Sequence, residues 1–406
     1  MIWSIAWRNV WRNKVRSIVM IVAIALGLFA GVFTMAFMQG TVDARVESAT
    51  KSELAHLQIH APRFSENNES SFYISNSNKM VQEIENLDSV KAASARLIAE
   101  AFITAAHGTG GGKLLGIDIE KERNVTDIWE HVIDGTYLEK TSRMPPVLIG
   151  EKLAKKLKLK IGSKINVQMV DLSGDLSAKG YRVSGIYKTV NTTFDETNLF
   201  VRYHDLQTQL GIEVNAAHEI AIAVDKGDEA VLVKSSIQNI VGENVVQTWK
   251  ELSPEMSLLT DSMDQYMYIF ILIILLGLCF GIINTMLMAV LERVKEIGML
   301  MAVGMNKRRI FRMIMLESVM LTITGGFFGI LIGSGITKFF ETTPIDVSMF
   351  SAGLEKMGFA TQIYTSLQSE TLITISILVI ITGLLSAIYP ARKALKLNPA
   401  EATRTD

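Results

Sequence analysis

The chain has 406 residues, of which 20% are charged, and its formal net charge is −1. Its mean hydropathy is +0.28, and an apolar average combined with many charges is typical of a protein with a membrane part and a soluble part. The single cysteine, Cys279, lies inside an apolar run, so the composition excludes a soluble part that is held together by disulfides.

Four long apolar runs occur at about 18–38, 267–291, 313–337 and 372–389. Each is long enough to cross a bilayer as a helix, because roughly 20 residues at 1.5 Å each span the ~30 Å hydrocarbon core. The first run exceeds the roughly 7–15 apolar residues of a cleaved signal peptide, so we interpret it as an uncleaved anchor, with cleavage as the alternative. This layout limits the function to transport, signalling or force transmission across a membrane.

Basic residues gather in three of the four short segments that flank the apolar runs. They are Arg8, Arg12, Lys14 and Arg16 at the start, Arg293, Lys295, Lys307, Arg308, Arg309 and Arg312 between the second and third runs, and Arg392, Lys393, Lys396 and Arg404 at the end. Basic residues near the ends of spans mark the cytoplasmic side. We therefore predict that both termini are cytoplasmic and that the segment 40–265 is extracytoplasmic.

The first 16 residues have the pattern of an amphipathic helix. Trp3, Trp7 and Trp11 are four positions apart and fall on one face, while the arginines fall on the opposite face. Tryptophan prefers the headgroup level and arginine favours anionic lipid, so we predict a helix anchored along the inner membrane surface. The alternative is an extension of the first span whose tryptophans pack on neighbouring helices.

The segment between the first two spans has mixed helical and strand patterns. Strand-like stretches occur at 57–61, 91–105, 164–170, 182–190, 199–202 and 219–224, and helical patterns occur at 79–87, 150–159 and 228–240. This mixture predicts an α+β domain, built from one or two lobes.

The segment 108–113, Gly-Thr-Gly-Gly-Gly-Lys, is similar to a phosphate-binding loop but lacks two of its requirements. His107 stands where the first glycine is needed, and Leu114 stands where Ser or Thr ligates magnesium. We interpret the segment as a flexible hairpin turn. The sequence contains no HExxH and no spaced Cys/His cluster, so we expect no catalytic, cofactor-binding or metal-binding residues in this chain and no binding of nucleic acid.

The link between the second and third spans carries apolar residues that it is too short to bury by itself. They are Ile297, Met299, Leu300, Met301 and Val303. Methionine-rich helices form adaptable docking surfaces, so we predict contact with a partner protein; a helix on the inner leaflet is the alternative.

Two further features lie in the third span. Gly325, Gly329 and Gly333 are spaced by four, which allows close helix packing, either within one chain or between two copies. Glu317 lies near the cytoplasmic end of this span as a membrane-boundary carboxylate. It either pairs with Arg309, Arg312 or another basic residue at the interface, or relays a proton or ion.

The link and the end of the chain resemble a known family. The stretch 293–304, Arg-Val-Lys-Glu-Ile-Gly-Met-Leu-Met-Ala-Val-Gly, with Ile310, Leu316 and Glu317 after it, is similar to the hallmark of FtsX-type ABC transporter permeases. The stretch 389–402, Tyr-Pro-Ala-Arg-Lys-Ala-Leu-Lys-Leu-Asn-Pro-Ala-Glu-Ala, is similar to the usual ending of that family, and 6–14, 147–154 and 181–187 also resemble it. The start and length look most like the lipoprotein-releasing (Lol-type) permeases, and the MacB-type permeases share the architecture.

The resemblance implies a bacterial inner-membrane subunit that works with partners. It implies a separate cytoplasmic ABC ATPase dimer, which binds ATP and magnesium, and a second permease chain, so that this chain is a transport subunit and not an enzyme. It implies mechanotransmission: motion of the ATPase reaches the extracytoplasmic domain through a coupling segment, which adds Glu296, Gly298 and Gly304 to the apolar residues of the link.

The implied cargo is a lipoprotein or another amphiphile, handed to a periplasmic chaperone or adaptor. Two alternatives stay open: MacB-type export of drugs, peptides or toxins, and FtsX-like regulation of a cell-wall hydrolase.

The predicted fold class is therefore a membrane protein with four transmembrane helices and a large extracytoplasmic α+β domain between the first and second. The predicted segments are an interfacial helix at 1–16, spans at 17–39, 266–291, 313–337 and 372–389, the α+β domain at 40–265, the coupling segment at 292–312, an extracytoplasmic loop at 338–371 and a cytoplasmic tail at 390–406.

Overall fold

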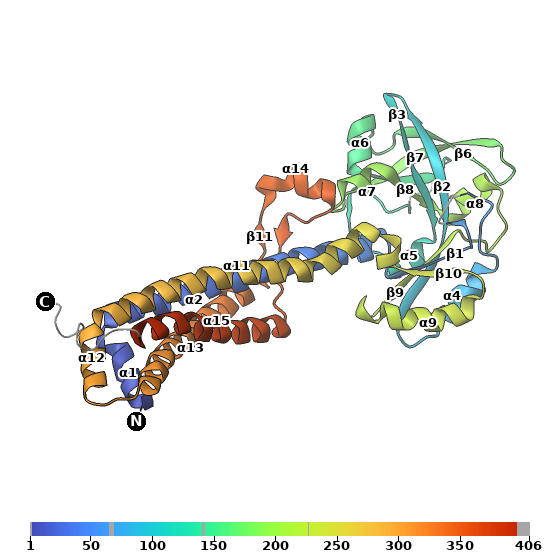
Figure 1. Cartoon of the computed structure of the whole chain (residues 1–406). Coiled ribbons are helices and arrows are strands. Elements are labelled where there is room, and N and C mark those ends of the chain that lie inside the picture. The colour runs from blue at the N-terminus through green and yellow to red at the C-terminus, as the bar shows by residue number, and fades with distance from the viewer. Residues whose placement is uncertain (1, 65–68, 140–142, 226, 396–406) are drawn as a thin grey trace. The chain divides into compact units, whose positions relative to one another are not determined.

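The computed structural model describes residues 2–64, 69–139, 143–225 and 227–395 (Figure 1). Most of the tail that was predicted at 390–406, and with it the end of the 389–402 motif, lies outside the described residues. The chain forms two compact units. We call them the helical unit, which comprises Met1–Asp43, Thr260–Asp346 and Gln362–Asp406, and the α+β domain, which comprises Ala44–Leu259 and Val347–Thr361.

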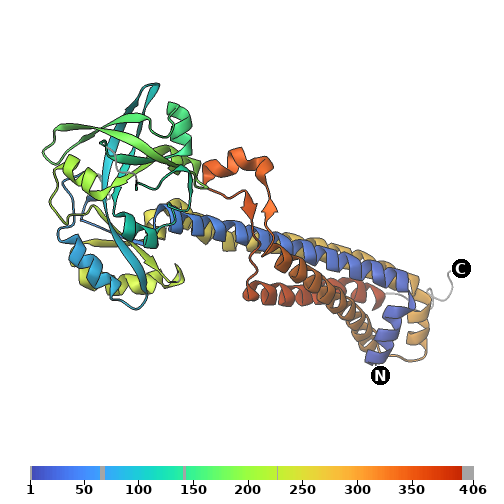
Figure 2. The ribbon, with the colours of Figure 1, turned by 180° about the vertical axis from the view of Figure 1, so that it is seen from behind.

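Within the described residues, four helices are long and apolar enough to cross a membrane, as the four apolar runs predict. They are α2 (Lys14–Ser48), α11 (Pro254–Glu292), α13 (Lys307–Phe340) and α15 (Ser369–Leu395). Two shorter helices, α1 (Ile2–Arg12) and α12 (Val294–Ala302), lie at the same end of the helical unit (Figures 1 and 2).

Helix α2 is the most enclosed of the long helices, and α11 is the least enclosed. In the most apolar stretch of each helix, 39% of α2 is buried inside the structure, compared with only 11% of α11. Ile24, Leu28 and Val32 of α2 belong to one apolar core with residues of α13 and α15. The apolar surface of α11, in contrast, is left for lipid or for another protein.

A close backbone approach fixes the segment before α15 against α2. Ser366 N–H donates to the carbonyl of Ala36 at 2.9 Å. A Cβ on Gly40 would lie 1.8 Å from the carbonyl oxygen of Tyr364, so only glycine fits at this position of α2.

The larger part of the α+β domain is a closed ring of strands. Its strands are β2 (Val90–Ala105), β3 (Gly108–Ile117), β8 (Asn198–Arg202), β5 (Pro146–Gly150), β7 (Leu176–Tyr187) and β6 (Lys164–Val170). Each strand pairs with the next in this order, and the pairing of β6 with β2, through Ile103 and Val167, closes the ring. The ring encloses a core to which β2 contributes every second residue, from Leu97 to Ile103.

The second lobe continues the same sheet from the N-terminal half of β2. It adds β9 (Glu219–Val224), β1 (Leu57–His60) and β10 (Val245–Thr248), with α4 (Ser77–Glu85) and α9 (Ala230–Val241) packed against them. The remaining elements are η1 (Ala49–Glu53), α5 (Ile119–Val125), β4 (Val132–Gly135), α6 (Glu151–Leu157), α7 (Thr192–Thr197), α8 (Tyr203–Leu210), η2 (Gly227–Glu229) and α10 (Trp249–Leu252). This is the predicted α+β architecture with two lobes.

The segment predicted as an extracytoplasmic loop at 338–371 contains short helices and strands. It contains β11 (Ile345–Asp346), η3 (Ser348–Phe350), α14 (Ser351–Leu354), η4 (Glu355–Met357) and β12 (Gln362–Ile363). Its middle part joins the α+β domain, because the hydroxyl groups of Thr192 and Thr193 in α7 donate to the carbonyls of Glu355 and Lys356 at 3.2 and 3.3 Å. Sequence patterns could not indicate this contact, since its acceptors are backbone carbonyls that any residue type provides.

Candidate functional site

The short helix α12 is set off from its neighbours by local backbone geometry. Arg293, with φ −107° and ψ 18°, interrupts the helical path between α11 and α12. Gly304, with φ +96°, ends the turn after α12, and Met305 N–H donates to the carbonyl of Leu300 at 2.9 Å. Asn306 then caps α13 by accepting the N–H of Arg308 at 3.0 Å. The link is therefore a separate helix with defined ends.

The residues predicted as one docking patch divide between two sides of α12. Ile297 and Gly298 are buried within the helical unit. Met299 and Val303 point outward, with 54% and 89% of their surface exposed. The other predicted residues differ in their exposure. Glu296, Leu300 and Met301 are half-buried, and Gly304 is exposed. Ile297 is thus part of the chain's own core and cannot serve a partner, so the outward surface is Met299 with Val303.

Ion pairs join α12 and its surroundings to the start of the chain. The Arg12 guanidinium contacts the carboxylate of Glu296, and Arg16 Nη1 lies 2.8 Å from Glu292 Oε2. Arg293 Nε lies 3.1 Å from Glu296 Oε2, and Arg293 Nη1 lies 3.3 Å from Glu317 Oε1. The hydrogen bond from Arg12 and the nearby Arg293 hold the pKa of Glu296 below its ordinary value. Glu317 therefore does have a basic partner, which is Arg293 and neither Arg309 nor Arg312.

Helix α1 buries aliphatic side chains and exposes tryptophan side chains. Ala6 and Val10 are buried, whereas Trp7 and Trp11 are 50% and 37% exposed. The two indole rings contact each other edge-on, with 5.9 Å between their centroids. Trp3 lies in the same helix, and its side chain is outside the described part of the structure. The exposed rings fit an interfacial anchor better than a core contact.

The three spaced glycines of α13 face α2 of the same chain. A Cβ on Gly325 would lie 2.8 Å from Cβ of Ile24, and one on Gly329 would lie 2.8 Å from the carbonyl oxygen of Ala25. One on Gly333 would lie 3.2 Å from Cβ of Val32. The first two distances are shorter than real Cβ contacts and the third is shorter than most of them, so the glycines allow the two helices to approach closely within one chain.

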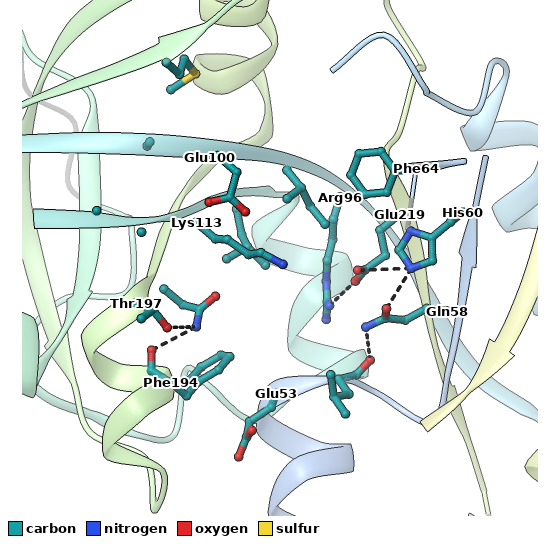
Figure 3. Close-up of a pocket in the computed structure, with 18 of the residues that line it drawn as sticks. Glu53, Gln58, His60, Phe64, Arg96, Glu100, Lys113, Phe194, Thr197 and Glu219 are labelled. Atoms are coloured by element: carbon teal, nitrogen blue, oxygen red, sulfur yellow. Dashed lines mark hydrogen bonds and ion pairs between the residues drawn. The ribbon is translucent and has the colours of Figure 1, made fainter. Parts of the chain in front are cut away.

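The α+β domain contains a cavity of about 1120 Å³ outside the ring of strands (Figure 3). Its floor is one face of β2 and β3, because Ile98, Glu100 and Phe102 pair with Leu115, Lys113 and Gly111. Its wall is formed by β1 and β9 with His60 and Glu219, and by the hairpin of β6 and β7 with Val170 and Leu176. The hairpin turn predicted at 108–113 is wrong for the glycines, which lie within strand β3.

A buried charge network lies at the deep end of this cavity. Arg96 Nε and Nη2 lie 3.1 and 2.5 Å from the two carboxylate oxygens of Glu122, and Nη1 lies 2.6 Å from Glu219 Oε1. Burial alone lowers the pKa of Arg96, but the charges of Glu122 and Glu219 outweigh it and raise that pKa above its ordinary value. The guanidinium therefore stays charged and is neutralised by its own chain.

A second set of hydrogen bonds completes the deep end. His60 Nδ1 lies 3.1 Å from the carbonyl of His218, and His60 Nε2 lies 2.9 Å from Gln58 Oε1. Gln58 in turn donates to the carbonyl of Leu54 at 2.7 Å. Phe64 is sandwiched between the rings of His60 and His218, at 5.5 and 5.1 Å between ring centroids. Each of these polar groups thus has a polar neighbour within the chain.

Sequence reasoning missed Arg12 and Arg16 as partners of the link and Asn9 as a partner of Glu317. It also missed Arg96 with its carboxylates. Each pair joins positions far apart in sequence, for which a single sequence carries no spacing signal. The one available signal was the alternation in β2, which places the charged residues Arg96 and Glu100 on the same face of the strand.

Comparison with known proteins matches both parts of the chain to described families. Residues 17–240 match the MacB-like periplasmic core domain, and residues 268–399 match the FtsX-like permease C-terminal region. An uncharacterized ABC transporter permease of Methanocaldococcus jannaschii is 27% identical over 56% of this chain and 55% of its own length. The lipoprotein-releasing system transmembrane protein LolC of Buchnera aphidicola is 24% identical over 71% of each chain.

Other relatives match over shorter stretches. The macrolide export ATP-binding/permease protein MacB of Chlorobaculum tepidum is 35% identical over 30% of this chain and 16% of that protein. The chain thus spans about half of the first relative and a small part of this one. Among solved structures, the periplasmic region of MacB from Actinobacillus actinomycetemcomitans is 8% identical, covers 51% of this chain and 91% of that one, and has a TM-score of 0.34. The extracellular domain of the transporter YknZ from Gram-positive bacteria is 15% identical, with coverages of 48% and 97% and a TM-score of 0.33.

Proposed function

The chain belongs to the family of ABC transporter permeases with a MacB-like periplasmic core domain and an FtsX-like C-terminal region, and from this premise we propose that it is the membrane subunit driven by a separate ATPase. ATP and magnesium bind to that ATPase dimer, and a second permease chain completes the membrane assembly. The family membership confirms the resemblance seen in the sequence, while the partners belong to this proposal.

Orientation follows from the basic residues. Arg12, Arg16 and Arg293 gather at the end of the helical unit that holds α1 and α12. Because basic residues near span ends stay on the cytoplasmic side, this end faces the cytoplasm of a bacterial inner membrane and the α+β domain faces outward.

The observation that carries the proposal is the construction of α12. Met299 of α12 and Val303, which directly follows the helix, are exposed at the cytoplasmic end, while ion pairs join Glu296 to Arg12 and to Arg293. An exposed apolar pair on a firmly held short helix suits a docking site, because binding buries apolar surface without first ordering the helix. Force applied there reaches α1 and the spans through the same ion pairs.

The cargo in this proposal is a lipoprotein or another amphiphile that the α+β domain extracts from the membrane and passes to a periplasmic chaperone. Similarity to LolC over 71% of both chains supports this choice. Export of a drug, peptide or toxin through a periplasmic adaptor is the second candidate, and the 35% identity to MacB over 127 residues favours it.

The ATPase contact is tested by placing a charge on the exposed surface of α12. Val303→Asp should abolish co-purification of the ATPase from native membranes, because burying an unpaired carboxylate costs several kcal/mol, roughly 3 or more. The matched control is Val214→Asp, since Val214 is 77% exposed in the α+β domain and should leave ATPase binding unchanged. Full ATPase binding and turnover with Val303→Asp would refute docking on α12.

The cargo is tested with the intact assembly in proteoliposomes. ATP-dependent release of a lipoprotein to a soluble acceptor supports the first candidate. Transport of a drug or peptide without lipoprotein release supports export instead.

A further inference from the structure

The cavity beside β2 and β3 has no role in the coupling mechanism described above, yet its features are those of a binding site. Ligand pockets are mostly apolar concavities, roughly 300–1,000 Å³ in volume, with a few convergent polar groups. This cavity, of about 1120 Å³, is slightly larger, and it lies wholly within the α+β domain.

Glycine creates the free space at the floor. Gly111 pairs with Phe102 across the strands, so both residues share the face that lines the cavity. A Cβ on Gly111 would meet no atom within 4 Å, and Gly111 has no left-handed backbone that would require glycine. The absence of a side chain at this position therefore leaves room without being needed for the fold.

Three apolar side chains in the lining of the cavity are exposed to solvent. Phe102, Val170 and Leu176 are 50%, 56% and 71% exposed, although they come from the strands of a well-packed ring. Exposed apolar side chains in the lining of a pocket offer surface on which an apolar part of a ligand can be buried.

The charges of the cavity indicate the headgroup of the ligand. Arg96 is neutralised by Glu122 and Glu219, Glu53 by Arg45, and Glu251 by Lys234. In the part of the chain that the structure describes, two charged side chains of the lining, Lys113 and Glu100, form no ion pair. Glu100 lies opposite Lys113 across the strands without forming an ion pair with it, and it is exposed to solvent and salt, whereas Lys113 is half-buried.

From these observations we propose that the cavity binds an amphiphile, with its apolar chain along Gly111, Phe102 and Leu176 and its anionic headgroup at Lys113. This deepens the proposed transport function and rests on it for the choice of an amphiphile. The deep network of Arg96 supplies a rigid end wall, because its polar groups already have partners.

The position of the cavity connects its occupancy with the chain segments that enter the domain. Glu53 and Leu54, which end and follow η1, and Leu252 and Pro254, which precede and begin α11, also line it. The wall of the cavity therefore includes residues next to two of the connections of the domain, so movement of either connection changes the shape of the site.

Binding is tested with the full chain in phosphatidylcholine nanodiscs, without any ATPase, using dansyl-undecanoate as the anionic probe. Its fluorescence in empty nanodiscs is subtracted. The parent should bind saturably, and Gly111→Trp should bind at least about tenfold more weakly because the indole fills the floor. Gly111→Ala is the matched control: it makes the same backbone change, leaves most of the space and should bind like the parent.

A second pair of measurements tests the headgroup and guards against misfolding. Lys113→Gln should weaken dansyl-undecanoate by about tenfold and leave a dansyl-alkylamine unaffected. A dansylated lysophosphatidic acid tests phosphate against carboxylate as the anionic group. Should Gly111→Trp fail to fold, Leu176→Glu, at an exposed position of the cavity lining, should still weaken binding of the anionic probe.

Three results would overturn the proposal. The first is probe binding that never exceeds that of empty nanodiscs. The second is equal binding of the probe by all three proteins, namely the parent, Gly111→Trp and Leu176→Glu. The third is tighter binding of the dansyl-alkylamine than of dansyl-undecanoate. Because no ATPase is present, failure here is separate from failure of the coupling proposal, which is read from ATPase co-purification.

Discussion

Asn9 in α1 donates a 2.6 Å hydrogen bond to the carboxylate of Glu317 in α13, across 308 positions of sequence. Arg293, between α11 and α12, lies 3.3 Å from both oxygens of the same carboxylate. One acidic side chain therefore joins three elements at the end of the helical unit.

Glu317→Gln should destabilise the chain by about 1–3 kcal/mol, because it removes the buried one of the two carboxylates that Arg293 contacts, while Glu296 remains and Asn9 keeps an acceptor. The measurement is thermal unfolding of the purified chain in nanodiscs. Glu370→Gln is the control, since Glu370 is exposed in the first turn of α15 and should shift unfolding less. A Glu317 variant that melts like the parent but loses transport would favour the ion-relay interpretation.

Replacing Gly329 with alanine should lower thermal stability even though alanine is the better helix former by about 1 kcal/mol. The added Cβ would lie 2.8 Å from the Ala25 carbonyl oxygen, so α2 and α13 must move apart. The same change at Gly335 of α13 meets no atom within 4 Å and should be neutral or stabilising. Equal melting temperatures for the two variants would contradict close packing of α13 on α2.

The proposed orientation predicts which surface cysteines react in intact spheroplasts. With Cys279 replaced by serine, cysteines at Val214 and Met349 should react with an impermeant thiol reagent, since these positions are 77% and 90% exposed. A cysteine at Val303, which is 89% exposed, should react only after the membrane is opened. Labelling of position 303 from outside, with protection of the other two, would reverse the orientation.

The α+β domain should lose stability as the pH falls below about 6.5, in part through His218. Burial lowers the pKa of His218 to about 4, and its Nδ1 accepts the Ile98 N–H at 2.9 Å. The unfolded chain therefore binds more protons than the folded one between pH 6.5 and 4, so this group's stabilisation is complete above 6.5 and declines below it. The full loss is about 3 kcal/mol.

The measurement is the melting temperature from pH 7.5 to 4.5. His218→Gln should flatten the curve in this window. His131 is the matched control of opposite sign, because its hydrogen bond with Asp127 raises its pKa, so His131→Gln should steepen the gain of stability with rising pH. An unchanged slope with His218→Gln would show that His218 protonates freely in the folded chain.

Force transmission predicts that stiffness near the start of α11 matters more than polar groups within the spans. A flexible Gly-Ser insertion after Asp261 should uncouple ATP hydrolysis from cargo release, because a flexible chain transmits little directed displacement. The same insertion after Gly242, in an exposed turn, should be tolerated. Asn284→Leu, at an exposed position of α11, should have little effect. ATP turnover and cargo release are scored separately, and normal release by the Asp261 insertion beside failure of Asn284→Leu would indicate a path between helices.

Sequence by itself determined the features that depend on local composition. The four spans follow from runs of apolar residues that are long enough to cross a bilayer, and the α+β class follows from the 3.6- and 2-residue periods of the intervening segment. The family follows from two continuous motifs in the link and at the end of the chain. Each of these signals is contained in neighbouring positions.

Tertiary structure decided everything that depends on which distant residues meet. The patch of α12 divided because Ile297 packs into the core while Val303 faces outward, and Glu317 pairs with Arg293 although Arg309 and Arg312 are closer in sequence. Gly111, in the glycine-rich stretch after His107, became part of the floor of a cavity because β3 pairs in register with β2. Apolar burial is non-directional and ion pairs form wherever the fold brings opposite charges together, so composition predicts that such groups are satisfied and only the fold determines by which partner.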